Sequence, residues 1–306
     1  MTKQKTMLIT GANGFTGQHA CHYFSQKNFH VIGTGRSEVK NIIEGSFLRC
    51  DLGNYQEIED TVEKVQPELI LHLAGKNSVA DSWANPAENI HTNVMGTVHL
   101  LESIRIKAPN ARTVVVGSTL SMPSLSSDPL HPYAVSKAMQ ILISRTWHQL
   151  FGLNIIVANP CNLIGPGASA GVCSLFAEKI AAMEIKQIPS VLQVDDLNQS
   201  RDFLDVRDAV RAYALLFEKG EPGEQYDLGT GNMRSLKTVV DIFQELANIP
   251  FIVQLKGNSS PSRADVLQRP KLDAIKNLGW TPAISFRQSA ADILNYYRFG
   301  QKNGEA

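Results

Sequence analysis

Short apolar runs alternate with longer amphipathic stretches through the first 160 residues of the chain. The apolar runs are bounded by glycine, proline or polar residues, which is typical of strands buried on both faces. The runs expected to be strands are residues 6–10, 30–36, 47–52, 68–75, 111–119 and 154–160. Between them, residues 55–65, 86–107 and 133–151 carry the patterns of helices. This alternation predicts an α/β fold built on a doubly wound parallel sheet.

The C-terminal half of the chain divides less regularly. We expect residues 1–160 to form one domain, with residues 202–221 returning to it as a helix. Residues 161–201 and 222–306 are expected to form a smaller C-terminal lobe that binds the substrate. Because no low-complexity linker separates these parts, we expect them to pack continuously.

A glycine-rich turn follows the first expected strand directly and opens a helix. Its glycines, Gly11, Gly14 and Gly17, are spaced three residues apart. Glycines at such a turn allow close approach of a pyrophosphate, and the N-terminus of the following helix favours anions. The turn therefore predicts a Rossmann-type dinucleotide site. The contacts expected from it are Gly11, Asn13, Gly14, Phe15, Thr16 and Gly17.

The ends of the next strands extend this expected site. Where an NAD enzyme carries an acid for the ribose hydroxyls, this chain has Arg36. An arginine suits the 2′-phosphate of NADP, so NADP(H) is expected to be preferred over NAD(H); the alternative is an arginine merely exposed at a strand end. Small residues after the fourth strand let a cofactor lie against the backbone. The further cofactor contacts expected are Asp51, Leu52, Leu73, Ala74, Gly75, Tyr133 and Lys137.

Tyr133 and Lys137 lie four residues apart, which places them on one face of the expected helix. A phenol has an ordinary pKa of about 10, and a nearby ammonium lowers it, so the pair can exchange a proton with a hydroxyl or carbonyl. The same spacing occurs by chance on solvated helices. The catalytic interpretation of the pair is supported here because the preceding strand ends in Ser118 and Thr119.

Composition narrows the class of partner. Lys plus Arg and Asp plus Glu both number 29, so bulk charge favours neither nucleic acid nor an anionic membrane. The four cysteines lack metal spacing and are expected to be reduced and buried. No stretch approaches the roughly 18 apolar residues of a membrane span, and the polar N-terminus does not resemble a signal peptide. A cytoplasmic protein without a metal is expected.

Together these motifs resemble those of the extended short-chain dehydrogenases/reductases, also called the NAD-dependent epimerase/dehydratase family. The resemblance is to the branch of this family that acts on nucleotide sugars. The matching stretches are residues 10–17, 51–52, 72–75, 93, 118–119, 133–137 and 159–162. The resemblance implies that Tyr133 is the acid/base, Lys137 its activator and Thr119 the hydroxyl that orients the substrate oxygen. It also implies that Asp51 bonds the adenine amine. Asn159 departs from the pattern, because the family commonly has an arginine there.

The C-terminal third is most similar to GDP-4-keto-6-deoxy-mannose reductases, over residues 199–213, 223–231, 279–282 and 292–297. By this resemblance the nucleotide sugar contacts Ser118, Thr119, Tyr133, Asn162, Lys179, Arg201 and Arg263. Arginine pairs with phosphate in a bidentate way, which favours Arg201 and Arg263; each residue could instead be ordinary surface. The resemblance further implies a homodimer through a four-helix bundle, unless the faces of helices 86–107 and 133–151 pack only on the sheet.

The residues after Thr119 separate the reactions of this family. Dehydratases carry an acidic residue within two positions of the catalytic threonine, but no Asp or Glu lies between Thr119 and Asp128. The expected reaction is NADPH-dependent reduction of the C4 ketone of a nucleoside-diphosphate 4-keto-6-deoxyhexose, with GDP favoured. Two alternatives stay open: a nucleotide-sugar 4-epimerase, and a non-catalytic NADP-sensing protein of the same fold.

Overall fold

The computed structural model describes residues 4–37, 46–121, 131–256 and 269–300. The chain divides into two compact units. The first contains residues 1–160, 210–228 and 271–280, and the second contains residues 161–209, 229–270 and 281–306.

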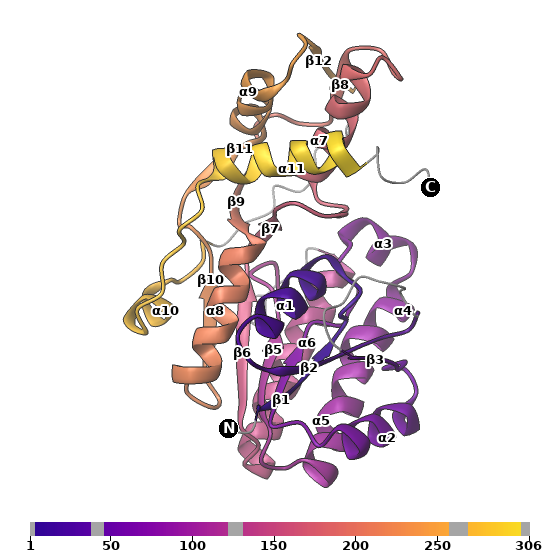
Figure 1. The fold of residues 1–306 in the computed structure, drawn as a ribbon, viewed down its shortest axis with the longest axis vertical. Helices are drawn as coiled ribbons and strands as arrows, with labels where there is room; N and C mark the ends of the chain where they lie inside the picture. Colours follow the sequence, from indigo (N-terminus) through magenta and orange to yellow (C-terminus); the bar gives the residue numbers. More distant parts are fainter. Residues whose placement is uncertain (1–3, 38–45, 122–130, 257–268, 301–306) are drawn as a thin grey trace. The chain divides into compact units, whose positions relative to one another are not determined.

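A seven-stranded parallel sheet forms the centre of the first unit (Figure 1). In spatial order its strands are β10 (Gln225–Leu228), β6 (Ile155–Pro160), β5 (Arg112–Val116), β4 (Leu69–His72), β1 (Thr6–Thr10), β2 (His30–Gly35) and β3 (Ser46–Arg49). Because β1 lies between β2 and β4, the strand order reverses direction there, which is where doubly wound sheets bind ligands. The predicted α/β fold with a doubly wound parallel sheet is confirmed.

Helices lie between the strands of this sheet along the chain or follow the last of them. They are α1 (Phe15–Ser25), α2 (Tyr55–Val65), α3 (Val79–Ala84), α4 (Pro86–Ile90), η1 (His91–Met95), α5 (Gly96–Lys107), α6 (Pro132–Phe151), α8 (Val206–Lys219) and α10 (Asp273–Asn277). The stretch expected as one helix over residues 86–107 contains a π-helical turn at η1. Local chemistry sets the helix ends: the Asn54 side chain accepts from the first turn of α2, and Gly152 ends α6 with a φ of 68°.

The return of the chain to the first unit differs from the expected 202–221. After residue 160, the residues that belong to the first unit are Val210–Leu228, which include β10, and Lys271–Trp280. Arg112 explains part of this arrangement, because its guanidinium donates to the carbonyls of Leu216 and Gly220 at the end of α8. Gly223, with a φ of 85°, then turns the chain into β10, which pairs with β6.

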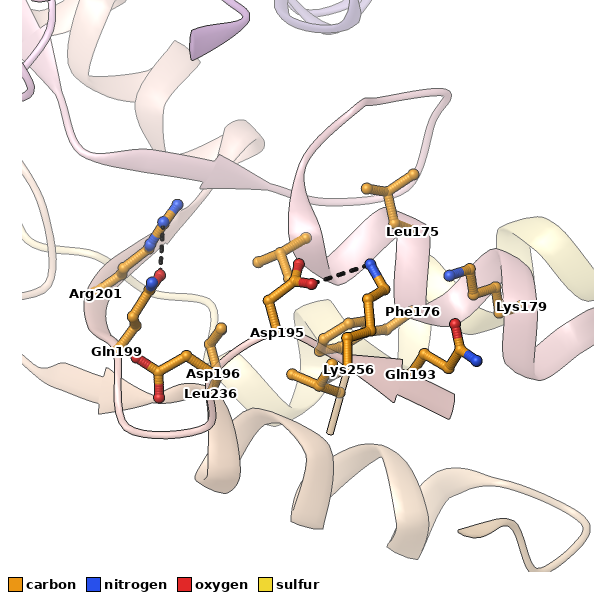
Figure 2. A pocket seen from close by; sticks show the side chains of 12 residues that line it. Leu175, Phe176, Lys179, Gln193, Asp195, Asp196, Gln199, Arg201, Leu236 and Lys256 are labelled. Carbon is orange, nitrogen blue, oxygen red and sulfur yellow. Dashed lines mark hydrogen bonds and ion pairs between the residues drawn. The ribbon is translucent and has the colours of Figure 1, made fainter. Parts of the chain in front are cut away.

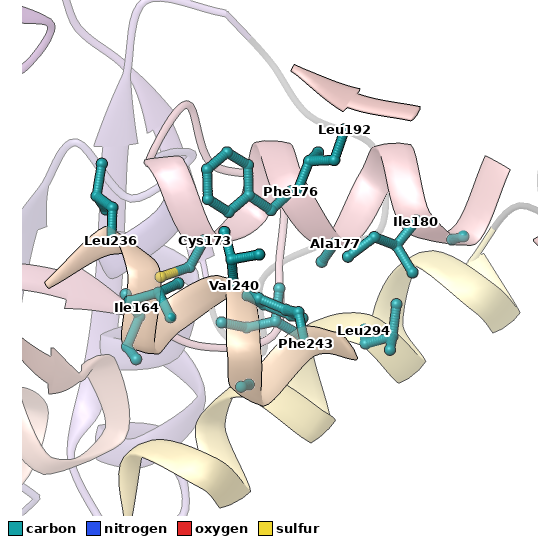
Figure 3. Close-up of a cluster of buried hydrophobic side chains, with 14 of the residues drawn as sticks. Ile164, Cys173, Phe176, Ala177, Ile180, Leu192, Leu236, Val240, Phe243 and Leu294 are labelled. Atoms are coloured by element: carbon teal, nitrogen blue, oxygen red, sulfur yellow. The ribbon is translucent and has the colours of Figure 1, made fainter. Parts of the chain in front are cut away.

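The second unit is built around its own apolar core (Figure 3). Its elements are β7 (Asn162–Ile164), α7 (Val172–Glu184), β8 (Val191–Val194), β9 (Ser200–Asp205), β11 (Met233–Ser235), α9 (Leu236–Leu246), β12 (Ile252–Leu255) and α11 (Phe286–Gly300). Phe176 and Ile180 of α7 meet Val240 and Phe243 of α9 and Leu294 of α11 in this core. Burial of such side chains is worth about 1.5–3 kcal/mol each.

A buried carboxylate fixes the start of α8 within the second unit. The Asp205 side chain is fully buried and accepts from the Arg207 guanidinium at 2.8 and 2.9 Å and from the Ser289 hydroxyl at 2.6 Å. Arg207 also pairs with Asp292 of α11 at 2.6 Å. Burial alone raises the pKa of Asp205, but the hydrogen bonds from Arg207 and Ser289 outweigh it and hold the pKa below its ordinary value.

We predict that Asp205→Asn lowers the free energy of unfolding by about 2–4 kcal/mol at pH 7, because Arg207 and Ser289 lose a charged acceptor. Since the folded-state pKa of Asp205 lies below the unfolded one, its contribution is complete above the unfolded pKa and is lost as the pH falls through the folded one. Urea unfolding at pH 7 and in acid measures both effects. The control Asp241→Asn, at an exposed pair with Lys237, should change stability by less than about 1 kcal/mol. Equal effects of the two variants would contradict the prediction.

Candidate cofactor and catalytic site

The glycine turn of the first unit leaves no room for side chains. Gly11 has a φ of 70°, and a Cβ added there would lie 2.8 Å from the Cα of Ala74. A Cβ at Gly17 would collide with the carbonyl oxygen of Gly11. Gly14 precedes α1 as its N-cap and supplies no side-chain cap, so backbone N–H groups of the first turn remain available to an anion. The turn fits the pyrophosphate of a dinucleotide.

The side chain of Asn13 adds an unsatisfied acceptor beside this turn. Its Nδ2 donates to the carbonyl of Ser37 at 2.5 Å, whereas its buried Oδ1 has no partner among the described residues. A hydroxyl or amine of a bound nucleotide is the kind of donor that such an atom needs. Arg36, the first residue after β2, is exposed. Phe15 and Thr16 are half-buried. The residues present therefore fit a dinucleotide cofactor.

The ends of β3 and β4 are held by hydrogen bonds of their own. Asp51 lies beyond the end of β3, and its Oδ1 accepts from the backbone N–H of Gly53 at 2.9 Å, while Leu52 is buried. After β4, Leu73 donates its N–H to the carbonyl of Thr10, and Ala74 donates to the Thr10 hydroxyl at 3.2 Å. These bonds hold the backbone of residues 73–74 against the end of β1.

The contact between Gly75 and Asn93 keeps the backbone after β4 close to the helices that follow. A Cβ at Gly75 would lie 2.7 Å from the Oδ1 of Asn93. That oxygen accepts from the N–H of Lys76 at 2.7 Å, and the Asn93 Nδ2 donates to the Ser136 hydroxyl at 2.9 Å. Only glycine fits position 75 without displacing Asn93.

Tyr133 and Lys137 are both 6% exposed on α6. His131 is the N-cap of this helix. Its Nδ1 accepts from the N–H of Ala134 at 2.9 Å, and its ring stacks on that of Tyr133. Lys137 donates from Nζ to the carbonyl of Val116 at 3.0 Å and to Oε1 of Gln140 at 2.8 Å. Burial lowers the pKa of Lys137 to about 8.

The pKa of Tyr133 is shifted against the expectation from sequence. Burial raises it, a hydrogen bond with Ser118 lowers it, and the net pKa is above the ordinary value. The Lys137 ammonium does not reverse this, because the hydrogen bonds that it makes are with Val116 and Gln140. The expected lowering of the Tyr133 pKa by Lys137 is therefore corrected: in the described protein the phenol stays protonated at neutral pH.

Ser118 is the hydroxyl whose interaction with the phenol lowers the Tyr133 pKa. Thr119 is half-buried, and its hydroxyl points to the carbonyl of Pro160 at 3.4 Å. The first unit thus brings together the phenol, the ammonium and the Ser118 hydroxyl at the ends of β5 and α6. Such a set can hold a carbonyl oxygen and transfer a proton to it.

The second unit carries a separate pocket of about 230 Å³ (Figure 2). Its charged and amide residues are Lys179, Gln193, Asp195, Asp196, Gln199, Arg201 and Lys256. Arg201 donates from Nη2 to Gln199 Oε1 at 3.1 Å, and its buried Nε has no partner among the described residues. Lys256 pairs with Asp195 at 3.1 Å. An unsatisfied guanidinium donor in a pocket that Lys179 also lines suits an anionic ligand such as a diphosphate.

The candidate substrate residues of the second unit do not all share this pocket. Lys179 and Arg201 line it, but Asn162 does not, and its Nδ2 donates to the carbonyl of Asp202 at 3.1 Å. Arg263 lies outside the described residues. Sequence reasoning missed Gln199 and Lys256. Gln199 stands two residues before Arg201, and this spacing could have indicated that the two side chains lie on one face of a strand. Lys256 reaches the pocket through the pairing of β12 with β8, which no sequence pattern indicates.

Within residues 4–37, 46–121, 131–256 and 269–300, His, Cys, Asp and Glu form no cluster that could hold a metal ion. The four cysteines are buried and free, as expected. None of the described helices has both the length and the apolar character to cross a membrane.

Several relatives of this chain are enzymes named for reactions on nucleotide sugars. The chain is 27% identical over 304 residues to GDP-6-deoxy-D-mannose reductase of Pseudomonas aeruginosa, covering 94% of this chain and 96% of the relative. It is also 27% identical over 345 residues to dTDP-glucose 4,6-dehydratase of Haemophilus influenzae, covering 97% and 99%. A UDP-glucose 4-epimerase of Mycolicibacterium smegmatis is 26% identical over 316 residues, covering 95% and 98%.

Solved structures agree on the fold. RMD from Pseudomonas aeruginosa, complexed with NADPH, has a TM-score of 0.82 at 25% identity, covering 96% of this chain and 98% of that one. A Thermus thermophilus UDP-glucose 4-epimerase in complex with NAD has the same TM-score at 24% identity, covering 98% and 100%. The model of the "NAD dependent epimerase/dehydratase family" matches residues 7–229, so the chain belongs to that family.

Proposed function

We propose that this protein is a reductase that uses NADPH to convert the C4 ketone of a nucleoside-diphosphate 4-keto-6-deoxyhexose, preferably GDP-linked, into an alcohol. One observation carries the proposal: a buried, protonated Tyr133 stands beside Lys137 in a chain with no acidic residue between Thr119 and Asp128. A dehydratase needs a carboxylate base next to the ketone, and an unactivated serine such as Ser121 cannot replace it.

The cofactor proposed is NADPH, which supplies a hydride to the carbonyl carbon when bound. Gly11, Gly14 and Gly17 would hold its pyrophosphate, and Asp51 its adenine amine. Arg36 would pair with the 2′-phosphate, which NAD lacks. The remaining contacts proposed, from sequence, are Asn13, Phe15, Thr16, Leu52, Leu73, Ala74 and Gly75.

Tyr133 acts as the proton donor in this proposal. Because its pKa is raised, the phenol carries its proton at neutral pH and can give it to the oxygen as negative charge develops there. Lys137, with a pKa of about 8, is mostly an ammonium at pH 7 and stabilises the phenolate left behind. The hydroxyls of Ser118 and Thr119 hold the same oxygen.

Recognition of the nucleoside diphosphate is assigned to the pocket of the second unit. The unsatisfied Nε of Arg201 and the ammonium of Lys179 support this assignment. Arg263 and Asn162 are proposed as further contacts on the resemblance alone. The cytoplasm, where NADPH is regenerated, is the proposed compartment.

A 4-epimerase is the second candidate, and the relationship to UDP-glucose 4-epimerases favours it. Such an enzyme would use the same Tyr133 and Lys137, but would return the hydride to the sugar. It would therefore interconvert two hydroxyl sugars without net consumption of NADPH.

We predict that Tyr133→Phe slows single-turnover oxidation of NADPH by GDP-4-keto-6-deoxymannose at least about 100-fold, since the proton donor is lost. Binding of NADPH should change by no more than a few fold. The control Tyr55→Phe removes a hydroxyl that lies near Glu59 on α2 and should leave the rate unchanged. Retention of most of the wild-type rate by Tyr133→Phe would remove Tyr133 from this role.

We predict that Arg36→Ala reduces the preference for NADPH over NADH, expressed as the ratio of kcat/KM values, by about 10- to 100-fold. This corresponds to loss of a charge-assisted contact with phosphate, while kcat/KM for NADH stays nearly constant. The control Arg145→Ala removes an exposed guanidinium from α6. If the two variants show the same cofactor preference as the wild type, Arg36 does not read the 2′-phosphate.

We also propose a homodimer formed through helices α5 and α6. Exposed apolar side chains on these helices support it: Ile106, Leu142, Leu150 and Phe151 are 46–67% exposed. A second copy of the chain would cover them. We predict that Leu142→Asp converts a dimer into a monomer in light scattering, whereas Ile252→Asp, at a residue 68% exposed on β12, does not. A wild-type monomer would refute the proposal.

A further inference from the structure

A chain of buried hydrogen bonds runs from Lys137 into the first unit, and sequence reasoning did not identify it. Lys137 Nζ donates to Gln140 Oε1 at 2.8 Å, and Gln140 Nε2 donates to the Thr97 hydroxyl at 2.9 Å. The Thr97 hydroxyl also lies 3.0 Å from Nε2 of His72, whose Nδ1 lies 2.8 Å from the Thr10 hydroxyl. Gln140 and Thr97 are fully buried.

The direction of every bond in this chain follows from counting protons. The single hydroxyl proton of Thr97 goes to the carbonyl of Asn93 at 2.7 Å, so Thr97 can only accept from its other neighbours. His72 must therefore donate from Nε2. Its Nδ1 is then bare and accepts from Thr10, whose oxygen accepts in turn from the N–H of Ala74.

The same count of protons determines the orientation of the Gln140 side-chain amide. An ammonium can only donate and Thr97 can only accept, so Oε1 must face Lys137 and Nε2 must face Thr97. A flipped amide would bring two donors together at Lys137 and two acceptors together at Thr97. Burial and the charge of Lys137 lower the pKa of His72 to about 3, which keeps the ring neutral as the chain requires.

We infer that Gln140 is a positioning residue for Lys137: its amide, oriented by Thr97, holds the ammonium in place and stabilises its charged form. The inference rests on the role proposed above for Lys137. Among the described residues the other acceptor of Nζ is a backbone carbonyl, so Gln140 is the side chain whose substitution can change the environment of the ammonium. The titratable neighbours are Tyr133 on the same helix and the neutral His72 on β4.

Titration of Lys137 tests this role without relying on activity. Protein labelled with ¹³C at lysine Cε is titrated by NMR, and the Lys137 signal is assigned from its loss in Lys137→Arg. The wild-type midpoint should lie near pH 8. Gln140→Glu should raise it by about one unit or more through a carboxylate partner, and Gln140→Met should lower it by about half a unit or more. The control Ser144→Ala, which removes a hydroxyl that donates to the backbone carbonyl of Gln140, should leave the midpoint unchanged.

Substitutions at Thr97 provide an independent arm should the Gln140 variants not fold. Thr97→Val removes the acceptor that orients the amide and should lower the midpoint, whereas Thr97→Ser should retain the wild-type value. Altered thermal stability with an unmoved Lys137 midpoint in the folded variants would show that Gln140 only fills space, and would overturn the inference.

The pH dependence of turnover separates this inference from the proposed function. If the protein reduces a 4-keto sugar, the alkaline limb of its rate should follow the NMR midpoint across the variants. Midpoints that move as predicted in a protein inactive on 4-keto sugars would refute the proposed function and leave the inference standing. An enzyme that is active on 4-keto sugars but whose Lys137 midpoints do not move would support the proposed function and refute the inference about Gln140.

Discussion

A buried ammonium is the constraint on which the proposed catalytic site of this structure depends. An isolated charge removed from water is strongly disfavoured, so Lys137 needs acceptors within the fold. Among the described residues it finds them in the strand-end carbonyl of Val116 and in the amide of Gln140, and in no carboxylate. Neutral acceptors leave the pKa of Lys137 low enough, about 8, for its charge to respond near physiological pH. A carboxylate partner would have stabilised the charge further and removed that sensitivity.

The same hydrogen bonds tie helix α6 to the end of β1, next to the glycine turn of residues 11–17. The chain of bonds that begins at Lys137 ends at Thr10, which accepts from Ala74, and Ala74 lies where a side chain on Gly11 would have to go. Displacement of one end would therefore strain the other. The raised pKa of Tyr133 and the low pKa of Lys137 share one cause, which is burial of both groups on the first two turns of α6.

Much of the first unit could be predicted from sequence, because its strands and helices are defined by local apolar patterns and its glycine turn by spacing. Six of the seven strands and the position of Tyr133 on α6 follow in this way. What could not be predicted depends on contacts distant in sequence: β10 joins the sheet only through pairing with β6, and Lys256 reaches the pocket only through β12 and β8. The upward shift of the Tyr133 pKa was also hidden, since spacing shows that Lys137 is near but not how deeply the phenol is buried.

Ketone reduction is the central claim, and the fate of the hydride tests it most directly. NADPH deuterated at the transferred position of C4 of the nicotinamide is incubated with GDP-4-keto-6-deoxymannose, and the sugar product is analysed by NMR and mass spectrometry. We predict one deuterium at C4 of a 6-deoxyhexose for each NADPH oxidised. NADPH that stays unoxidised, or a sugar product without deuterium at C4, would contradict ketone reduction.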